Sequence, residues 1–129
     1  RAYNESSRII AVMEGIFRSG FDQIVIVDDG SKDGTRELLS GHFDGKYNYI
    51  RHSINRGAGA ALETGFEFIR RFGEKNGWEY VVTFDADGQH DIGDIEKFFH
   101  FLQKHPVVKV VFGSRFIEKT RSNVPFFRK

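Results

Sequence analysis

The sequence has no cysteine among its 129 residues. This absence excludes disulfide bonds and any chemistry that depends on a thiolate, and it fits a reducing compartment. Long apolar runs are also missing. No stretch approaches the roughly 20 consecutive apolar residues of a membrane-spanning helix, and no signal-peptide pattern opens the chain. We therefore expect a soluble polypeptide in the cytoplasm.

The chain also lacks an excess of charge of either sign. It has 19 Lys and Arg against 18 Asp and Glu, for a formal net charge of +1, so the composition makes no case for a nucleic-acid partner. The charge is uneven, because residues 115–129 alone carry a net +4. With three phenylalanines, this basic tail suits peripheral contact with anionic lipid at the cytoplasmic face of a membrane, although a solvated chain end is the commoner explanation.

Apolar runs of strand length alternate with amphipathic helical patterns over one domain, residues 1–129. The expected strands lie at residues 24–27, 47–51, 80–84 and 107–112, and the expected helices at residues 4–18, 33–39, 58–76 and 92–102. This alternation predicts a doubly wound α/β fold with a mostly parallel sheet. Residues 1–5 resemble a strand-to-helix loop with no strand before it, and the last residues carry no cap. We therefore expect a chain truncated at both ends, without a first strand and an acceptor-binding half.

Two carboxylates separated by one residue, Asp85 and Asp87, follow the apolar run at residues 80–84. Successive side chains of a strand alternate between faces, so both carboxylates would lie on one side, at the carboxyl end of the sheet. Magnesium prefers oxygen ligands and usually takes one or two carboxylates together with substrate phosphates. The pattern suits a divalent metal held against a diphosphate. A solvated strand end or a helix N-cap would explain an isolated pair of this kind equally well.

A second pair of carboxylates, Asp28 and Asp29, follows another apolar run and precedes a glycine turn. Such groups can accept hydrogen bonds from a base or from ribose hydroxyls. Alternatively Asp28 caps the turn, and we expect one of the two to be structural. Further along, Arg56 and Gly57 open a helix whose N-terminus favours anions, without the glycine patterns of a Rossmann fingerprint or a P-loop.

Five motifs span essentially the whole chain. In order they are Tyr3-Asn4-Glu5, Val27-Asp28-Asp29-Gly30-Ser31, Asn55-x-Gly57-x-Gly59-Ala60-Ala61, Asp85-Ala86-Asp87-Gly88-Gln89-His90 and Gly113-Ser114-Arg115. Together they resemble family 2 glycosyltransferases with the GT-A fold, most closely the dolichol-phosphate mannosyltransferase or polyprenyl-phosphate glucosyltransferase type. Two prolines expected in that family are replaced, by Arg1 and by Ile92.

The resemblance implies a nucleotide-sugar site. The positions that it assigns to the base and ribose are Tyr3, Glu5, Val27 and Asp29. It places Asp85 and Ala86 beside the ribose and the diphosphate. The implied donor is a nucleoside-diphosphate sugar of the UDP-glucose or GDP-mannose class.

The resemblance also implies a metal and catalytic groups. Asp87 and Gln89 match ligands of a Mg²⁺ or Mn²⁺ that bridges the diphosphate, with Asp85 near the metal. Asp87 and Arg115 are the catalytic positions, since Arg115 matches a basic residue facing the diphosphate or the acceptor phosphate. His90 either orients a ligand through a hydrogen bond or caps the next helix.

The implied reaction is an inverting sugar transfer to a polyprenyl phosphate or a growing glycan. The acidic base that family members use on hydroxyl acceptors lies beyond residue 129, so this piece alone need not be active. A non-catalytic nucleotide-sugar-binding module is the main alternative. A haloacid-dehalogenase-like phosphatase also uses two such aspartates, but after its first strand, and a sugar nucleotidyltransferase would need a glycine- and arginine-rich loop that this sequence lacks.

Overall fold

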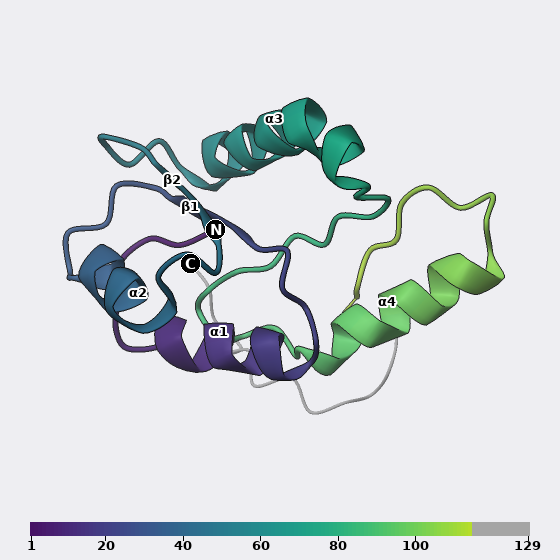
Figure 1. The fold of residues 1–129 in the computed structure, drawn as a ribbon, viewed down its shortest axis with the longest axis horizontal. Coiled ribbons are helices and arrows are strands. Elements are labelled where there is room, and N and C mark those ends of the chain that lie inside the picture. Colours follow the sequence, from purple (N-terminus) through teal and green to yellow (C-terminus); the bar gives the residue numbers. More distant parts are fainter. Residues whose placement is uncertain (115–129) are drawn as a thin grey trace, which may run out of the picture. The chain divides into compact units, whose positions relative to one another are not determined.

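A computed structural model describes residues 1–114 of the chain (Figure 1). The chain forms two compact units, Arg1–Ile95 and Glu96–Lys129, the second described as far as residue 114. The elements in chain order are α1 (Ile9–Arg18), β1 (Val25–Asp28), α2 (Thr35–Phe43), β2 (Asn48–Arg51), α3 (Ala58–Asn76) and α4 (Gly93–Lys104). Helices and strands alternate as far as α3, which confirms the α/β class.

Strands β1 and β2 pair in parallel along their whole length, from Val25 opposite Asn48 to Asp28 opposite Arg51. Parallel pairing was expected from the continuously apolar character of β1, which predicts that both faces of the strand are covered. The prediction of a parallel sheet is therefore confirmed for these two strands.

Residues 1 and 2 extend this sheet on the other side of β1. Ala2 forms a parallel bridge with Asp28, and its N–H donates to the carbonyl of Val27 at 2.9 Å. On the opposite side of Arg1, its nitrogen donates to the carbonyl of Phe84 at 2.8 Å and its carbonyl accepts from the N–H of residue 86 at 3.0 Å. This alternation is the hydrogen-bond pattern of a parallel pair. The order of neighbouring segments is thus β2, β1, residues 1–2, residues 84–86.

The two faces of β1 are covered by different helices, as Figure 1 shows for the Arg1–Ile95 unit. Ile26, 5% exposed, lies in a cluster with apolar side chains of α1 and α2, including Leu39 and Phe43. On the other face a Cβ added at Gly65 of α3 would lie 3.6 Å from Val27. Burying each large apolar side chain of this kind stabilises the fold by about 1.5–3 kcal/mol. The burial of Phe43 accounts for α2 running four residues past its predicted end.

Two expected strands are absent within residues 1–114: residues 80–84 and 107–112 belong to no β-ladder. Val81 is 44% exposed and Val107 is 86% exposed. An apolar run becomes a strand only where a neighbouring backbone accepts its hydrogen bonds, and here only residues 84–86 find such a neighbour, at Arg1. The complete doubly wound sheet stays a prediction.

The predicted start of the first helix was also wrong. Asn4 has φ of +54° and does not cap α1, which begins at Ile9. Its side-chain oxygen instead accepts the N–H of Lys32 at 2.9 Å, so it fastens the first loop to the turn after β1. Asparagine tolerates this left-handed conformation better than most residues. At the other end of a helix, the prediction that Gly77 closes α3 is confirmed by its φ of +69°.

Candidate functional site

The carboxyl ends of the parallel segments meet at one edge of the sheet. From residues 1–2 the sheet continues to β1 and β2, and the chain then returns to the opposite side at residues 84–86. Open α/β sheets bind ligands outside the carboxyl ends at such a reversal of order. The structure therefore brings the predicted site residues of segments 3–5, 28–29 and 85–89 to the same edge.

Asp28 serves the fold. Its side chain is fully buried and accepts the N–H of Ser31 at 2.8 Å and the hydroxyl of Tyr49. The guanidinium of Arg51 lies 3.6 Å away. Burial, and secondly the hydrogen bond to Asp28, raise the pKa of Tyr49. The interpretation that Asp28 caps the turn is confirmed, and this carboxylate has no face toward solvent.

Asp29 is also buried, at 2% exposure, and both its oxygens are bonded to the protein. One oxygen accepts from His52 Nδ1 at 2.7 Å and from the N–H of Arg56 at 2.8 Å, and the other accepts from the N–H of Gly57 at 2.7 Å. Burial alone would raise the pKa of Asp29, but these hydrogen bonds hold that pKa below its usual value. Its contact with a base or ribose stays a prediction, as does that of Val27, which is only 4% exposed.

Tyr3 and Glu5 follow the central segment of the sheet. Tyr3 is 37% exposed at this edge. The Oε2 atom of Glu5 is buried and accepts no hydrogen bond within residues 1–114, since the Arg8 guanidinium, at 3.6 Å, is too distant for one. A buried acceptor without a donor costs roughly 1–3 kcal/mol. A hydroxyl or N–H of a ligand would satisfy it.

Asp85 is engaged in an ion pair. Its carboxylate lies 3.0 Å from Nε of Arg1 and 4.0 Å from Nε2 of His90. The ring of His90 packs edge-on against Phe84 at a centroid distance of 5.1 Å. Arg1, one of the two departures from the family pattern, thus places a cation directly on a predicted site carboxylate.

Asp87 forms fewer polar contacts within residues 1–114 than the other aspartates of the site. Its Oδ1 accepts the N–H of Gln89 at 2.9 Å, across a turn in which Gly88 has φ of +72°. Within residues 1–114 its Oδ2 has no hydrogen-bond partner in the structure. Ala86, 8% exposed, packs in the core between the two acidic residues and holds their backbone in place.

The residues of this loop have the donor chemistry of a magnesium or manganese site. No group of three or more His, Cys, Asp and Glu side chains in the described part of the chain could hold a metal by itself. Mg²⁺ needs no such cage, because it binds through one or two carboxylates and takes its other ligands from substrate phosphates and water. Asp87, with Asp85 and Gln89 two residues before and after it, fits this mode. Arg115, the second predicted catalytic residue, lies outside the described residues.

Sequence reasoning gave no role to His52, although the structure places it among the site residues. It directly follows β2, is 8% exposed, and contacts Asp29 through one ring nitrogen and Thr64 through the other. The available signal was its position: a titratable residue immediately after a strand of the predicted parallel sheet, at the edge where the carboxylates gather.

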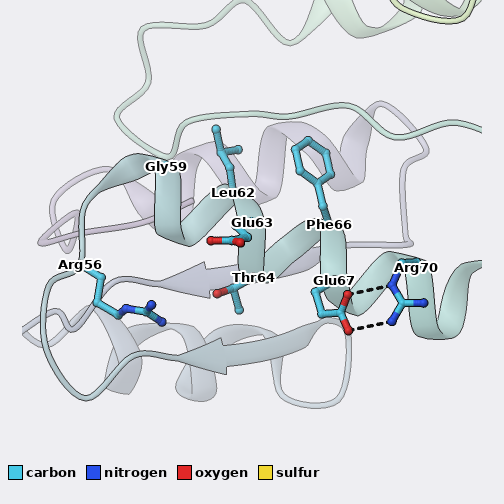
Figure 2. A pocket seen from close by; sticks show the side chains of 8 residues that line it. All are labelled: Arg56, Gly59, Leu62, Glu63, Thr64, Phe66, Glu67 and Arg70. Atoms are coloured by element: carbon cyan, nitrogen blue, oxygen red, sulfur yellow. Dashed lines mark hydrogen bonds and ion pairs between the residues drawn. The ribbon is translucent and has the colours of Figure 1, made fainter.

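An open hollow of about 870 Å³ runs along α3 and the loop before it. Figure 2 shows Leu62 and Phe66 pointing away from the strands, Thr64 pointing toward them, and Glu67 paired with Arg70. Leu62 is 37% exposed and Phe66 is 50% exposed. Two of its lining residues, Arg56 and Thr64, contact Asp29 and His52 at the sheet edge, but the lining includes none of the predicted metal or nucleotide residues.

Comparisons with known proteins agree with the motifs. The sequence model of the family described as glycosyl transferase family 2 matches residues 1–126. An uncharacterized protein of Methanocaldococcus jannaschii is 35% identical over 135 residues, covering 99% of this chain and 50% of that protein. A UDP-N-acetylglucosamine–dolichyl-phosphate N-acetylglucosaminyltransferase of Methanococcus voltae is 33% identical over a match that covers 99% of this chain and 55% of that protein. A dolichyl-phosphate beta-glucosyltransferase of Saccharomyces cerevisiae is 33% identical over a match that covers 80% of this chain and 33% of that protein.

The chain spans about half the length, or less, of these curated relatives. No solved structure gives a significant match. Among the helices of residues 1–114, none is both long and apolar enough to span a bilayer. The family match nevertheless covers nearly the whole chain, with the five motifs inside it. The chain belongs to glycosyl transferase family 2.

Proposed function

We propose that this chain is the donor-binding part of an inverting glycosyltransferase that moves a sugar from a nucleoside-diphosphate sugar to a lipid phosphate. Family membership supports the transferase activity. The names of the relatives in Methanococcus voltae and Saccharomyces cerevisiae, both dolichyl-phosphate transferases, support a polyprenyl-phosphate acceptor rather than a glycan.

One observation carries the proposal: two incompletely satisfied carboxylates flank the point where the segment order reverses. Glu5 follows residues 1–2, and Asp87 follows the neighbouring residues 84–86. Each has an oxygen without a hydrogen bond within the part of the chain that the structure describes. Two acceptors at the carboxyl edge suit the hydroxyls of a nucleotide on one side and a cation bound to its diphosphate on the other.

In the proposed reaction an acceptor phosphate oxygen bonds to the anomeric carbon while the bond from that carbon to the diphosphate breaks. Asp87, together with Gln89, would hold the Mg²⁺ or Mn²⁺. Asp85 would lie beside the metal while paired with Arg1. When bound, the metal stabilises the charge that develops on the leaving diphosphate. The start of α3 presents unbonded N–H groups that favour the same anion. A phosphate acceptor is already ionised near neutral pH and needs no strong base.

The test is a thermal-shift screen of the full-length protein with UDP-glucose, GDP-mannose and UDP-N-acetylglucosamine, each with Mn²⁺ and with EDTA. A ligand that binds only the folded form raises the melting temperature, so one of these donors should stabilise the protein in the presence of the metal. Asp87→Asn should weaken that binding at least tenfold, about 1.4 kcal/mol. The matched control is Asp44→Asn, the same change at an exposed position after α2, which should bind as the wild type does.

Transfer is assayed separately with a short-chain polyprenyl phosphate. Metal-dependent donor binding without any sugar transfer would favour the non-catalytic binding module. Phosphate release from simple phosphoesters, lost in Asp85→Asn, would favour the phosphatase. Absence of stabilisation by all three donors would reject the donor site itself.

A further inference from the structure

A buried chain of polar groups joins three elements of the sheet edge. Asp29 at the end of β1 contacts Nδ1 of His52, which follows β2, at 2.7 Å. Nε2 of the same ring lies 2.9 Å from the hydroxyl of Thr64 on α3. Figure 2 shows Thr64 pointing from the helix toward the strands, the direction that this contact requires. The carboxylate and the ring are both nearly inaccessible, at 2% and 8% exposure.

The donor in the contact between Asp29 and His52 follows from which of their atoms carry a proton. An ionised carboxylate only accepts, and Asp29 already accepts two backbone N–H groups, which keep its pKa low despite burial. Nδ1 of His52 must therefore carry the proton of the contact at 2.7 Å. The hydroxyl of Thr64 lies within 2.9 Å of both Nε2 and the carbonyl of Ala60, so it completes the ring's second contact. The ring is thereby held at both nitrogens.

Asp29 also binds the loop before α3, so holding its carboxylate in place restrains that loop as well. Its two oxygens bind the N–H groups of Arg56 and Gly57, the last residues before the helix begins at Ala58. The first intrahelical bond runs from Ala61 to Gly57, so the N–H groups of the first turn are unbonded within the helix and open to an anion. The orientation of the Asp29 carboxylate thus fixes where this anion-binding turn stands relative to the sheet edge.

We infer that His52 is a positioning residue of the donor site, acting through its Nδ1–H bond to Asp29. The ring holds the carboxylate, the carboxylate holds the loop at residues 55–57, and the loop sets the start of α3 against the donor diphosphate. This inference rests on the proposed transferase function for its kinetic consequence, but the restraint on the loop is a property of the folded protein alone.

The two ring nitrogens can be replaced one at a time in the full-length protein. In His52→Asn the amide nitrogen falls near the position of Nδ1 and can still donate to Asp29. In His52→Gln it falls near Nε2 and reaches Thr64 instead. We expect His52→Gln to raise the donor KM about tenfold or more, with kcat changed by less than about threefold, and His52→Asn to rescue the donor KM to within about threefold of wild type. His42→Gln, a change at an exposed histidine of α2, is the matched control.

Hydrogen exchange gives a readout that does not depend on activity. The amides of Arg56 and Gly57 should exchange faster in His52→Gln than in the wild type and should remain protected in His52→Asn. Equal donor KM and equal exchange in the two variants would overturn the inference. If no donor binds even to the wild type, the proposed function fails, whereas the exchange comparison still decides whether His52 restrains the loop.

The wild-type protein supplies a second measurement should His52→Gln fail to fold. A ¹⁵N–¹H spectrum of the histidine rings should show a protected proton on Nδ1 of His52. A ring protonated only on Nε2 would overturn the inference, because no proton would then join it to Asp29.

Discussion

Gly30, in the turn after β1, offers a sharp test of how the site loop is built. Its φ is +80°, and a Cβ at this position would lie 2.8 Å from the carbonyl carbon of Ile54 and 2.9 Å from the nitrogen of Asn55. Gly34 has nearly the same conformation, with φ of +84°, but a Cβ there would meet nothing within 4 Å. The pair therefore separates two effects of replacing glycine by alanine: backbone strain, common to both, and contact with the loop, present only at Gly30.

The strain of a left-handed conformation costs a residue with a Cβ about 1–2 kcal/mol, and we expect Gly34→Ala to lose about this much free energy of unfolding. Gly30→Ala adds a contact below 3.0 Å with backbone atoms, which cannot rotate away as a side chain can. Forcing extra volume into a packed position typically costs a further ~1–3 kcal/mol. The expected total at Gly30 is about 2–5 kcal/mol, a large share of the ~5–15 kcal/mol that stabilises a typical protein.

Urea unfolding of the purified variants measures both losses, provided that the slope with denaturant is unchanged. Donor affinity should distinguish the two variants further, because the added Cβ at residue 30 would push Ile54 and Asn55 away and so move the loop that Asp29 holds. Gly30→Ala should therefore weaken metal-dependent donor binding, while Gly34→Ala leaves it as in the wild type. Equal losses of stability in the two variants would refute the reasoning, since the close approach of Gly30 to the loop would then carry no energy.

Three further predictions concern single groups. Tyr49→Phe leaves a buried carboxylate without its hydroxyl donor and should cost about 1.5–3 kcal/mol in urea unfolding, whereas Tyr47→Phe should cost less than about 0.5 kcal/mol. An NMR titration of the exposed Asp33 carboxyl should give a pKa of about 2, since hydrogen bonds from neighbouring hydroxyl and amide groups outweigh its partial desolvation, and a value near 3.8 would contradict the structure. Because this pKa is lowered, the stability that Asp33 contributes is complete above about pH 4 and is lost as the pH falls toward 2. Arg1→Gln removes the cation beside Asp85, so calorimetry should show tighter Mn²⁺ binding, and unchanged affinity would argue against the metal site.

The local features of the fold were predictable because they depend on short stretches of sequence. The apolar run of β1 and the glycine that closes α3 at residue 77 were both recognised. The apolar run at residues 80–84 forms no strand, because a strand needs a partner elsewhere in the chain. Its apolar pattern predicts burial on a sheet, but the backbone of Arg1 supplies hydrogen bonds only at the end of the run, and Val81 is 44% exposed.

The site shows the same division between local and distant information. The sequence indicated that one of the two adjacent aspartates after β1 is structural. It did not indicate which one, because the two residues follow the strand directly and differ in nothing that their spacing reveals. The answer depends on side chains about 20 residues further on. Tyr49 and Arg51 face Asp28, while His52 faces Asp29, so both carboxylates are engaged inside the protein.

The contacts of the acidic groups at the sheet edge indicate where a donor would bind. Asp28 and Asp29 are satisfied by the protein, and Asp85 is paired with Arg1. In contrast, Oε2 of Glu5 and Oδ2 of Asp87 have neither a hydrogen bond nor a close ion pair within residues 1–114. These two residues follow neighbouring segments, one on each side of the reversal in segment order, whereas the satisfied pair lies at the end of β1. Burying an acceptor or a charge without a partner is costly, so a ligand gains most where such groups are still available. We therefore expect the donor's hydroxyls and its metal-bound diphosphate to contact the edge at residues 3–5 and 85–89, with β1 acting as the support that holds the loop before α3.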